Sequence, residues 1–388
     1  MKKKIAILGS TGSIGKTLIN IIKKDKKNFE IILLSANKNI KDLFKQVKMF
    51  KVKNIIITDR RNYLLSKKLF KNKKVDIFND FKSFKSIFGS SKIDYVMNSL
   101  VGIDGLKPTL DIIKFTKTIA IANKESIICG WPLINSALNK NKTKFIPIDS
   151  EHFSIWSLMQ NVKSKNVEKI FITASGGPFN NLPLNGFKNI TMKDALNHPS
   201  WKMGKKISID SATMMNKVFE VIEAKKIFNF EYEKIEILVH PKSYVHAIVK
   251  FKNGLTKILI HETNMTIPIF NSIYQKFEKI ISPKKIDLDI LNDLNFKPID
   301  AKKFPVVDVL KKLPKNDSLF ETILVVANDL LVSKFLKKEI KFVDISIILL
   351  KLLKSKELKS YKSIKPKNVN DIIKLHDYVS LKINALSV

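Results

Sequence analysis

The sequence predicts an α/β fold: an N-terminal doubly wound, Rossmann-like parallel sheet, then an α+β middle domain and a C-terminal helical bundle. Up to residue 148, short β-branched apolar runs alternate with amphipathic stretches, which is typical of parallel strands buried on both faces. Beyond residue 149 the pattern becomes mixed. From residue 318 there is no glycine and one proline, and apolar residues recur at helical spacing.

The elements follow in order along the chain. The strands predicted in the first half cover residues 4–8, 30–34, 54–58, 95–98, 118–122 and 145–148, with helices such as 16–24 and 40–50 between them. In the second half we expect a strand at 169–173, an irregular stretch at 179–207, a helix at 211–228 and strands near 235–239, 245–251 and 256–261. Residues 283–305 carry three prolines and are predicted to be a linker. The domains expected are therefore 1–149, 150–282 and 306–388.

Composition excludes several classes of protein. No apolar run approaches the roughly 18 residues of a membrane helix, and only four apolar residues separate the basic start from Gly9, too few for a secretory signal. The single cysteine, Cys129, excludes an internal disulfide and a Cys-rich zinc site. We therefore expect a cytoplasmic protein without a membrane partner.

The net charge of +35 raises the possibility of a nucleic-acid or anionic-surface binder, whose binding would depend strongly on salt and need no metal. However, all basic residues except Arg60 and Arg61 are lysines, and they are spread along the whole chain. Base recognition favours the planar fork of arginine. We interpret the charge as a composition bias and predict no specific nucleic-acid partner.

A glycine-rich turn, GSTGSIG at 9–15, directly follows the first predicted strand and opens the first helix. Such a turn lets the backbone approach a diphosphate at the helix N-terminus. A Walker P-loop would need glycine at position 10, where this chain has Ser10, so a variant dinucleotide fingerprint fits better. After the second strand there is no carboxylate to meet a ribose 2′-hydroxyl, but there is Lys38, which favours NADPH over NADH.

Carboxylates follow the strand at 145–148. Asp149 and Glu151 point the same way in an extended chain, as a hard divalent cation requires. A helix start capped by Asp149 or Ser150 is the alternative, and both interpretations stay open. On the predicted helix 211–228, Thr213, Asn216, Lys217 and Glu220 share a face, which suits either a charged, metal-bound substrate or a solvated surface.

Three further segments carry polar candidates. Ser175 precedes two glycines and can offer a hydroxyl beside backbone amides to a phosphate. His198, Trp201 and Met203 lie in a long loop, where the two large side chains serve either in packing or in a lid. Lys124 stands at the end of a sheet strand, where open α/β sheets bind ligands.

Six motifs in this order resemble the 1-deoxy-D-xylulose 5-phosphate reductoisomerase family over nearly the whole chain. They are GSTGSIG at 9–15, ANKES at 122–126, DSEH at 149–152, SGGPF at 175–179, the run 198–217 and HPKSYVH at 240–246. The resemblance implies an NADP-dependent oxidoreductase that uses NADPH and Mn²⁺ or Mg²⁺. Its reaction would be the rearrangement and reduction of 1-deoxy-D-xylulose 5-phosphate to 2-C-methyl-D-erythritol 4-phosphate in the non-mevalonate isoprenoid pathway. It also implies a homodimer whose middle domain carries catalysis, the lid loop and the dimer contacts. A dehydrogenase of the same fold with another phosphorylated substrate is the alternative.

The resemblance assigns roles by matching position. The implied metal ligands are Asp149, Glu151 and Glu220. The implied phosphate pocket consists of Ser175, Ser211, Asn216 and Lys217. Groups around the reacting carbons are Lys124, Ser150 and His198, under a lid with Trp201 and Met203. The cofactor residues are Thr11, Gly12, Ser13, Ile14, Asn37, Lys38, Asn39, Asn123, Glu125 and Gly204.

The chain also departs from the family pattern. Asn37 and His261 stand where glycine is common, and Phe153 stands where a small or polar residue is typical. The segment between Glu151 and Ser175 is shorter than usual. None of these positions is an implied metal ligand or part of the implied phosphate pocket, so we expect them to affect lid packing and dimer contacts rather than the reaction.

Overall fold

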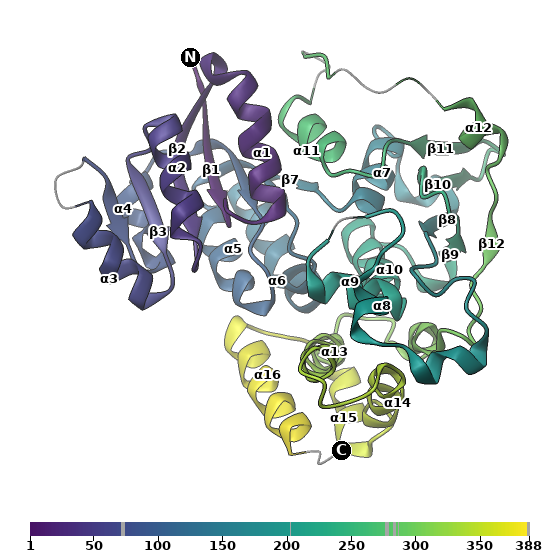
Figure 1. Cartoon of the computed structure of the whole chain (residues 1–388). Helices are drawn as coiled ribbons and strands as arrows, with labels where there is room; N and C mark the ends of the chain where they lie inside the picture. The colour runs from purple at the N-terminus through teal and green to yellow at the C-terminus, as the bar shows by residue number, and fades with distance from the viewer. Residues whose placement is uncertain (71–73, 202, 276–278, 282–284, 286, 386–388) are drawn as a thin grey trace. The chain divides into compact units, whose positions relative to one another are not determined.

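A computed structural model describes residues 1–70, 74–201, 203–275, 279–281, 285 and 287–385 (Figure 1). The chain forms two compact units. The first comprises Met1–Ser126, Leu133–Phe153 and Met265–Pro283, and the second comprises Ile127–Pro132, Ser154–Asn264 and Lys284–Val388. No helix among the described residues is both long and apolar enough to cross a membrane.

The first unit is built on a seven-stranded, entirely parallel sheet with the order β4-β3-β2-β1-β5-β6-β7. Its strands are β1 (Lys3–Leu8), β2 (Phe29–Ala36), β3 (Asn54–Ile57), β4 (Asp76–Phe78), β5 (Ile93–Asn98), β6 (Thr116–Ile121) and β7 (Lys144–Pro147). The strand order reverses direction at β1, between β2 and β5, which is the switch point where such sheets bind ligands. The predicted parallel sheet is confirmed, with β4 as an unpredicted edge strand.

Helices connect these strands. They are α1 (Ser13–Lys24), α2 (Ile40–Phe50), α3 (Arg60–Leu69), α4 (Phe84–Phe88), α5 (Leu106–Ile113) and α6 (Lys124–Asn141), with 3-10 turns at Lys26–Asn28, Phe81–Ser83 and Ile103–Gly105. A late segment, α11 (Thr266–Ile273), also belongs to this unit. Its Ser272 Oγ lies 2.7 Å from the hydroxyl of buried Tyr95, and the Ile273 carbonyl accepts a 2.8 Å hydrogen bond from Lys3 Nζ. The sequence pattern did not indicate this return of the chain.

The second unit contains a five-stranded mixed sheet with the order β11-β10-β8-β9-β12. Its strands are β8 (Val167–Ala174), β9 (Ile235–Val239), β10 (Val245–Phe251), β11 (Thr256–Ile260) and the short β12 (Lys297–Pro298). β8 runs parallel to β9 and antiparallel to β10. This confirms the predicted α+β character, and β12 was not predicted.

The remaining helices begin with α7 (Ser150–Leu158), which crosses the division between the units. Those that follow are α8 (Met192–Leu196), α9 (Lys205–Ala212), α10 (Met215–Phe228), α12 (Leu288–Asn292), α13 (Phe320–Leu336), α14 (Phe342–Leu352), α15 (Lys356–Lys359) and α16 (Val369–Asn384). Short 3-10 turns occur at Ser164–Asn166, Leu184–Asn189, Tyr232–Lys234, Pro305–Lys312 and Ser360–Ser363. Phe335 of α13 packs on Phe342 of α14 with ring centroids 5.8 Å apart. The predicted C-terminal helical bundle is confirmed.

Three predictions of local structure were wrong. The helix expected at 211–228 is interrupted at Met214, whose φ of 65° breaks the helical hydrogen bonding, so Ser211 lies in the last turn of α9 while Lys217 lies in α10. The stretch expected to be irregular, 179–207, contains α8 and the start of α9. The predicted linker contains α12 and β12, and its residues 283, 284 and 286 lie outside the described residues. Isolated short amphipathic segments give too weak a periodic pattern to be recognised.

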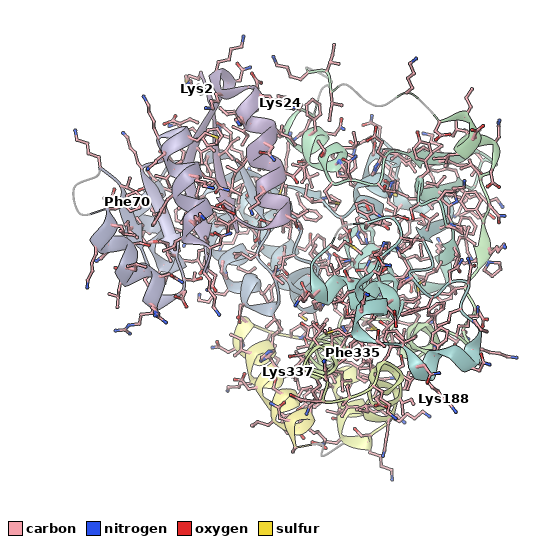
Figure 2. The ribbon with its side chains drawn as sticks, viewed as in Figure 1. Lys2, Lys24, Phe70, Lys188, Phe335 and Lys337 are labelled. Atoms are coloured by element: carbon pink, nitrogen blue, oxygen red, sulfur yellow. The ribbon has the colours of Figure 1, made fainter. Side chains whose placement is uncertain are left out.

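Figure 2 shows how side chains divide between core and surface. Lysines such as Lys2, Lys24 and Lys188 are exposed, whereas Phe70 and Phe335 are buried. Most of the charge therefore lies on the surface, as long ammonium side chains require.

Candidate functional site

The glycine-rich turn follows β1 and leads into α1. Gly9 has a φ of 80°, and a Cβ there would lie 2.7 Å from the Ser99 carbonyl oxygen. A Cβ on Gly15 would lie 2.5 Å from the Gly9 carbonyl oxygen. No side chain caps α1 at Gly12, so the first amides of the helix are available to an anion. This geometry suits a diphosphate, and the assignment of Thr11, Gly12, Ser13 and Ile14 to the cofactor stays a prediction.

The turn after β2 is exposed and carries the residues predicted to meet the adenosine phosphate. Asn39 caps α2 by accepting the Asp42 amide at 3.1 Å, and Asn37 Nδ2 donates to Thr58 Oγ1 at 2.8 Å. Asn37 is not among the residues with positive φ, so this chain does not need glycine at that position. Lys38 is exposed beside them, while the Asp42 carboxylate is paired with Lys16 at 2.7 Å.

Asn123 and Lys124 start α6 at the carboxyl end of β6. Asn123 Oδ1 accepts the Ser126 amide at 2.6 Å, and its Nδ2 donates to the carbonyls of Leu100 and Gly102. This buried amide therefore caps the helix and fixes the neighbouring loop. Lys124 Nζ lies 2.8 Å from Asp149 Oδ2, and both Lys124 and Glu125 are buried. The sequence predicted both Lys124 and Asp149 as site residues but did not predict that they pair.

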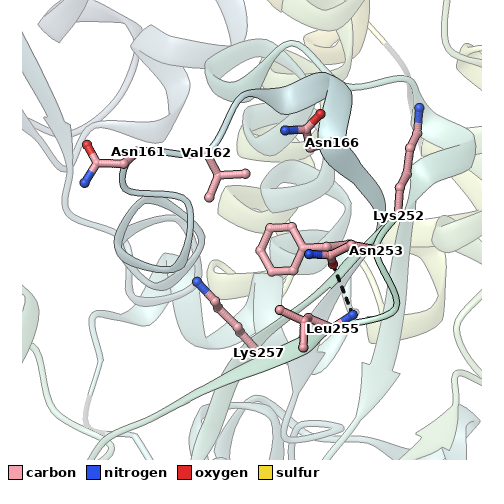
Figure 3. A pocket seen from close by; sticks show the side chains of 8 residues that line it. Asn161, Val162, Asn166, Lys252, Asn253, Leu255 and Lys257 are labelled. Atoms are coloured by element: carbon pink, nitrogen blue, oxygen red, sulfur yellow. Dashed lines mark hydrogen bonds between the residues drawn. The ribbon is translucent and has the colours of Figure 1, made fainter.

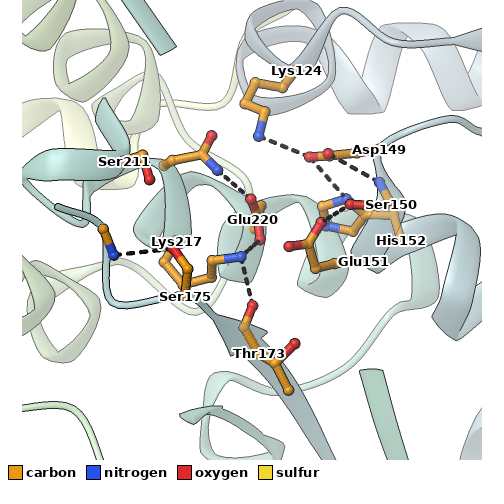
Figure 4. Close-up of polar contacts among 12 residues, drawn as sticks. Lys124, Asp149, Ser150, Glu151, His152, Thr173, Ser175, Ser211, Lys217 and Glu220 are labelled. Carbon is orange, nitrogen blue, oxygen red and sulfur yellow. Dashed lines mark hydrogen bonds and ion pairs between the residues drawn. The ribbon is translucent and has the colours of Figure 1, made fainter. Parts of the chain in front are cut away.

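Asp149 stands at the junction of β7 and α7 (Figure 4). Its carboxylate also accepts the Ser150 amide at 3.1 Å and lies 3.6 Å from His152 Nδ1. Burial alone would raise the pKa of Asp149, but the Lys124 ammonium and then His152 lower it well below its ordinary value. Ser150 Oγ donates to Glu151 Oε2 at 2.6 Å. The carboxyl groups of Asp149 and Glu151 thus lie at the start of a helix, where the helix dipole favours negative charge.

In the second unit, the polar face of α10 is buried. Lys217 and Glu220 are 6% and 1% exposed, so the solvated-face alternative is wrong. Lys217 Nζ lies 2.5 Å from Glu220 Oε2 and donates to the Thr173 carbonyl at 2.7 Å, while Asn216 Nδ2 donates to Glu220 Oε1 (Figure 4). Burying an ammonium and a carboxylate costs free energy unless the two charges are paired, and here Lys217 and Glu220 pair with each other. The contact with Thr173 uses its backbone carbonyl, which leaves no signal in the sequence.

His198 joins two hydroxyls of the same unit. Its Nε2 lies 3.2 Å from Ser175 Oγ and 3.1 Å from Ser211 Oγ. Its Nδ1 accepts the amides of Ser200 and Trp201, so the proton of the neutral ring sits on Nε2. Burial and the Lys217 ammonium lower the pKa of His198 to about 4. The ring is therefore neutral near pH 7 and donates toward the serine pair.

The loop that contains Trp201 and Met203 joins this cluster to α9. Both side chains are half-buried, and Gly204 is exposed at the N-terminus of α9. The indole of Trp201 meets the ring of His246 edge-on, with centroids 6.1 Å apart. Trp201 is thus only partly buried, and the lid and packing interpretations both stay open.

A hollow of about 500 Å³ lies elsewhere in the second unit (Figure 3). It is lined by residues after α7 and around the β10–β11 turn, including Asn161, Lys252 and Lys257. None of the predicted site residues lines it, and most of its polar side chains are exposed.

A glycine turn at the switch point of a parallel sheet is typical of a dinucleotide-dependent oxidoreductase, and a buried lysine–carboxylate face suits an anionic substrate. Comparison with known families agrees. Residues 5–130 match the model of 1-deoxy-D-xylulose 5-phosphate reductoisomerase, residues 145–228 match its C-terminal domain, and residues 260–380 match the DXP reductoisomerase C-terminal domain. The chain belongs to the 1-deoxy-D-xylulose 5-phosphate reductoisomerase family, which confirms the resemblance and the predicted enzyme class.

Individual relatives cover the whole chain. The 1-deoxy-D-xylulose 5-phosphate reductoisomerase of Pelagibacter ubique (strain HTCC1062) is 63% identical over 387 residues, covering 100% of both chains. The enzyme of Sulfurihydrogenibium sp. (strain YO3AOP1) is 38% identical, covering 90% of each. The Zymomonas mobilis enzyme, solved with NADPH, has a TM-score of 0.88 at 31% identity and covers 100% and 99% of the two chains. A DOX-P reductoisomerase solved with NADPH, fosmidomycin and magnesium has a TM-score of 0.90 at 28% identity, covering 99% and 98%.

Proposed function

We propose that this protein converts 1-deoxy-D-xylulose 5-phosphate into 2-C-methyl-D-erythritol 4-phosphate, using NADPH and a divalent cation, Mg²⁺ or Mn²⁺. The observation that carries this proposal is the buried face of α10, where Lys217 and Glu220 are paired beside the Ser175, His198 and Ser211 cluster. A phosphorylated, metal-dependent substrate needs such a combination of ammonium, hydroxyl donors and carboxylate. Membership of the family supports the particular substrate.

The residues proposed to hold the cation are Asp149, Glu151 and Glu220. Their donor set is all carboxylate oxygen, which suits a hard cation, and the lowered pKa of Asp149 keeps that ligand ionised. When bound, the cation supplies Lewis-acid polarisation of the substrate's carbonyl oxygen. Lys124 and Lys217 balance the charges of Asp149 and Glu220, so the carboxylates are held ready without a large desolvation penalty.

Ser175, Ser211, Asn216 and Lys217 are proposed to bind the phosphate group. Gly177 N–H donates to Ser175 Oγ at 3.1 Å, which leaves the hydroxyl proton available to an anion. His198 contacts both serine hydroxyls and fixes their orientation. A neutral His198 contributes a hydrogen-bond donor without a charge, so the positive charge that faces the phosphate comes from the Lys217 ammonium.

For the cofactor, we propose that Thr11, Gly12, Ser13 and Ile14 receive the diphosphate, while Asn37, Lys38 and Asn39 surround the 2′-phosphate. Asn123, Glu125 and Gly204 complete the proposed contacts. NADPH, when bound, supplies the hydride for the reduction. Trp201 and Met203 are proposed to close over the substrate, with Lys124, Ser150 and His198 around its carbon chain, so that water is excluded during reduction.

We further propose a cytoplasmic homodimer with three domains, at 1–149, 150–282 and 306–388. Strand β11 supports the dimer because it lies at the edge of its sheet and exposes apolar side chains. Ile258, within the strand, is 42% exposed, and Leu255, just before it, is 58% exposed. Sedimentation of the purified protein tests this assembly. A single species with the mass of one chain would contradict it.

The decisive experiment measures NADPH oxidation with 1-deoxy-D-xylulose 5-phosphate, with and without Mn²⁺ or Mg²⁺. Activity should require both substrate and cation. Glu220→Gln preserves shape but removes one ligand charge, so metal affinity and turnover should both fall, and turnover should recover partly at high Mn²⁺. Glu233→Gln, at an exposed position, is the matched control. Full activity of E220Q at low metal would remove the ligand assignment, and oxidation only with another phosphorylated substrate would favour the alternative dehydrogenase.

A further inference from the structure

We propose that His261 is a positioning residue for the indole of Trp201: its ring stacks on His246 and thereby fixes the surface against which Trp201 lies. This inference depends on the proposed role of Trp201 as a lid residue.

The two histidines form a tight stack inside the second unit. His246 belongs to β10 and His261 directly follows β11, its antiparallel neighbour. Their ring centroids lie 3.7 Å apart with planes 15° from parallel, and the residues are 2% and 8% exposed. The pairing register shifts between Val245 and Ala247, so His246 occupies an irregularity of the ladder that redirects its side chain.

Backbone carbonyls fix both rings. His246 Nε2 donates to the His261 carbonyl at 3.1 Å, and His261 Nδ1 donates to the Glu262 carbonyl at 2.7 Å. Because a carbonyl only accepts, each of these ring nitrogens carries a proton. Neither ring can turn without losing a hydrogen bond, so the stack is a rigid element rather than two mobile side chains.

Trp201 lies against the stack. Its indole meets His246 at 75° with centroids 6.1 Å apart, the edge-to-face geometry that aromatic pairs favour. Its backbone amide donates to His198 Nδ1 at 3.0 Å. Trp201 is thus held at two points, by its ring on the histidine stack and by its amide on the His198 cluster with Ser175 and Ser211. With glycine at position 261, one face of His246 would lose its partner and the indole its fixed support.

The test compares His261→Gly with His261→Phe, which keeps a flat ring at the position. Each variant is also made with Trp201→Phe, and the difference between the two emission spectra isolates the Trp201 indole from the other tryptophans. In H261G, we expect the Trp201 emission to move to longer wavelength and its anisotropy to fall. The KM for 1-deoxy-D-xylulose 5-phosphate should rise about three- to tenfold while kcat changes by less than about twofold, the size of one lost aromatic contact.

In H261F, both the emission and the KM should stay near those of the unmodified protein. His376→Ala, at an exposed histidine of α16, is the control for removing a histidine elsewhere. Unchanged Trp201 emission and KM in H261G, or equal losses in H261F and H261G, would overturn the proposal. If the unmodified protein oxidised no NADPH with this substrate, the proposed function would fail, whereas the Trp201 emission would still decide whether His261 positions the indole.

Discussion

Replacing Lys226 by methionine should destabilise the second unit strongly. Lys226 lies in α10, and its Nζ is 2.5 Å from Asp317 Oδ1 and 3.1 Å from Glu321 Oε1. The side chains of Lys226 and Glu321 are 2% and 1% exposed, and that of Asp317 is 29% exposed. Without the ammonium, two carboxylates face each other, one of them fully buried. The same helix carries Lys217 and Glu220 one to three turns earlier.

The size of the effect follows from burial. Removing one partner of a buried ion pair costs about 3 to 5 kcal/mol, and we expect about 3 because Asp317 is partly solvated and Ser318 still donates to Glu321 at 2.6 and 3.1 Å. For a unit of this size, each kcal/mol lowers Tm by about 2 to 4 °C, so the melting temperature should fall by roughly 6 to 12 °C.

The effect should be present at neutral pH. Burial alone would lower the pKa of Lys226, but Glu321 and Asp317 raise it above its ordinary value. A base whose folded pKa is raised stabilises the fold fully below its unfolded pKa, and the contribution is lost only as pH rises through the folded value. The difference between K226M and the unmodified protein should therefore persist from neutral to mildly alkaline pH.

Thermal melting followed by circular dichroism measures the prediction. Lys311→Met is the matched control because Lys311 pairs with Asp308 at 2.7 Å while 79% exposed, and such surface pairs contribute less than about 1 kcal/mol. If K226M and K311M melted within about 1 °C of each other, the reasoning on buried charge would be refuted.

Three further predictions concern the proposed site. Lys38→Glu should narrow or reverse the preference for NADPH over NADH in steady-state kinetics, because it repels a 2′-phosphate; equal use of both cofactors by the unmodified protein would remove the basis for this prediction. The imidazole of His198 should titrate near pH 4 by NMR, and stability should decline as pH falls below about 6.5, because the unfolded chain then takes up a proton that the folded chain refuses; a midpoint near 6.5 would contradict the burial argument. Trp201→Ala should raise the substrate KM or lower kcat while the apo melting temperature stays nearly constant; a loss of about 3 to 5 kcal/mol with unchanged kinetics would identify the indole as a core anchor.

The parallel sheet was predictable because its strands are continuous buried runs, which have no other stable arrangement over so many repeats. Strand β4 escaped prediction since it has only three residues, Asp76–Phe78, and none of them is fully buried. The break between α9 and α10 depends on the left-handed backbone of Met214, and methionine carries no propensity for that conformation. The sequence therefore did not predict the break between α9 and α10.

The same limit applies to the candidate site. The motifs identified Lys124, Asp149, Lys217 and Glu220 one by one, whereas their pairing depends on tertiary distances that no spacing encodes. His198 was recognised from its loop, but its neutral state follows from burial and from two backbone amides at Nδ1. The residue types thus predicted which functional groups the site contains, whereas their ion pairs and the protonation state of His198 depend on the folded structure.

Burial distinguishes the few lysines in specific ion pairs from the many lysines on the surface. In a chain with so many of them, a lysine in a motif means little, and most are exposed. Among the described residues, the buried ones are Lys124, Lys217 and Lys226, and each is paired with a carboxylate. An ammonium leaves water only where a partner offsets its desolvation, so these positions are specified by their surroundings. Lys124 and Lys217 pair with the proposed metal ligands Asp149 and Glu220. Lys226 stabilises α10, the helix that carries Glu220. Because only these three described lysines are buried and each is paired, the net charge of +35 is a property of the protein's surface.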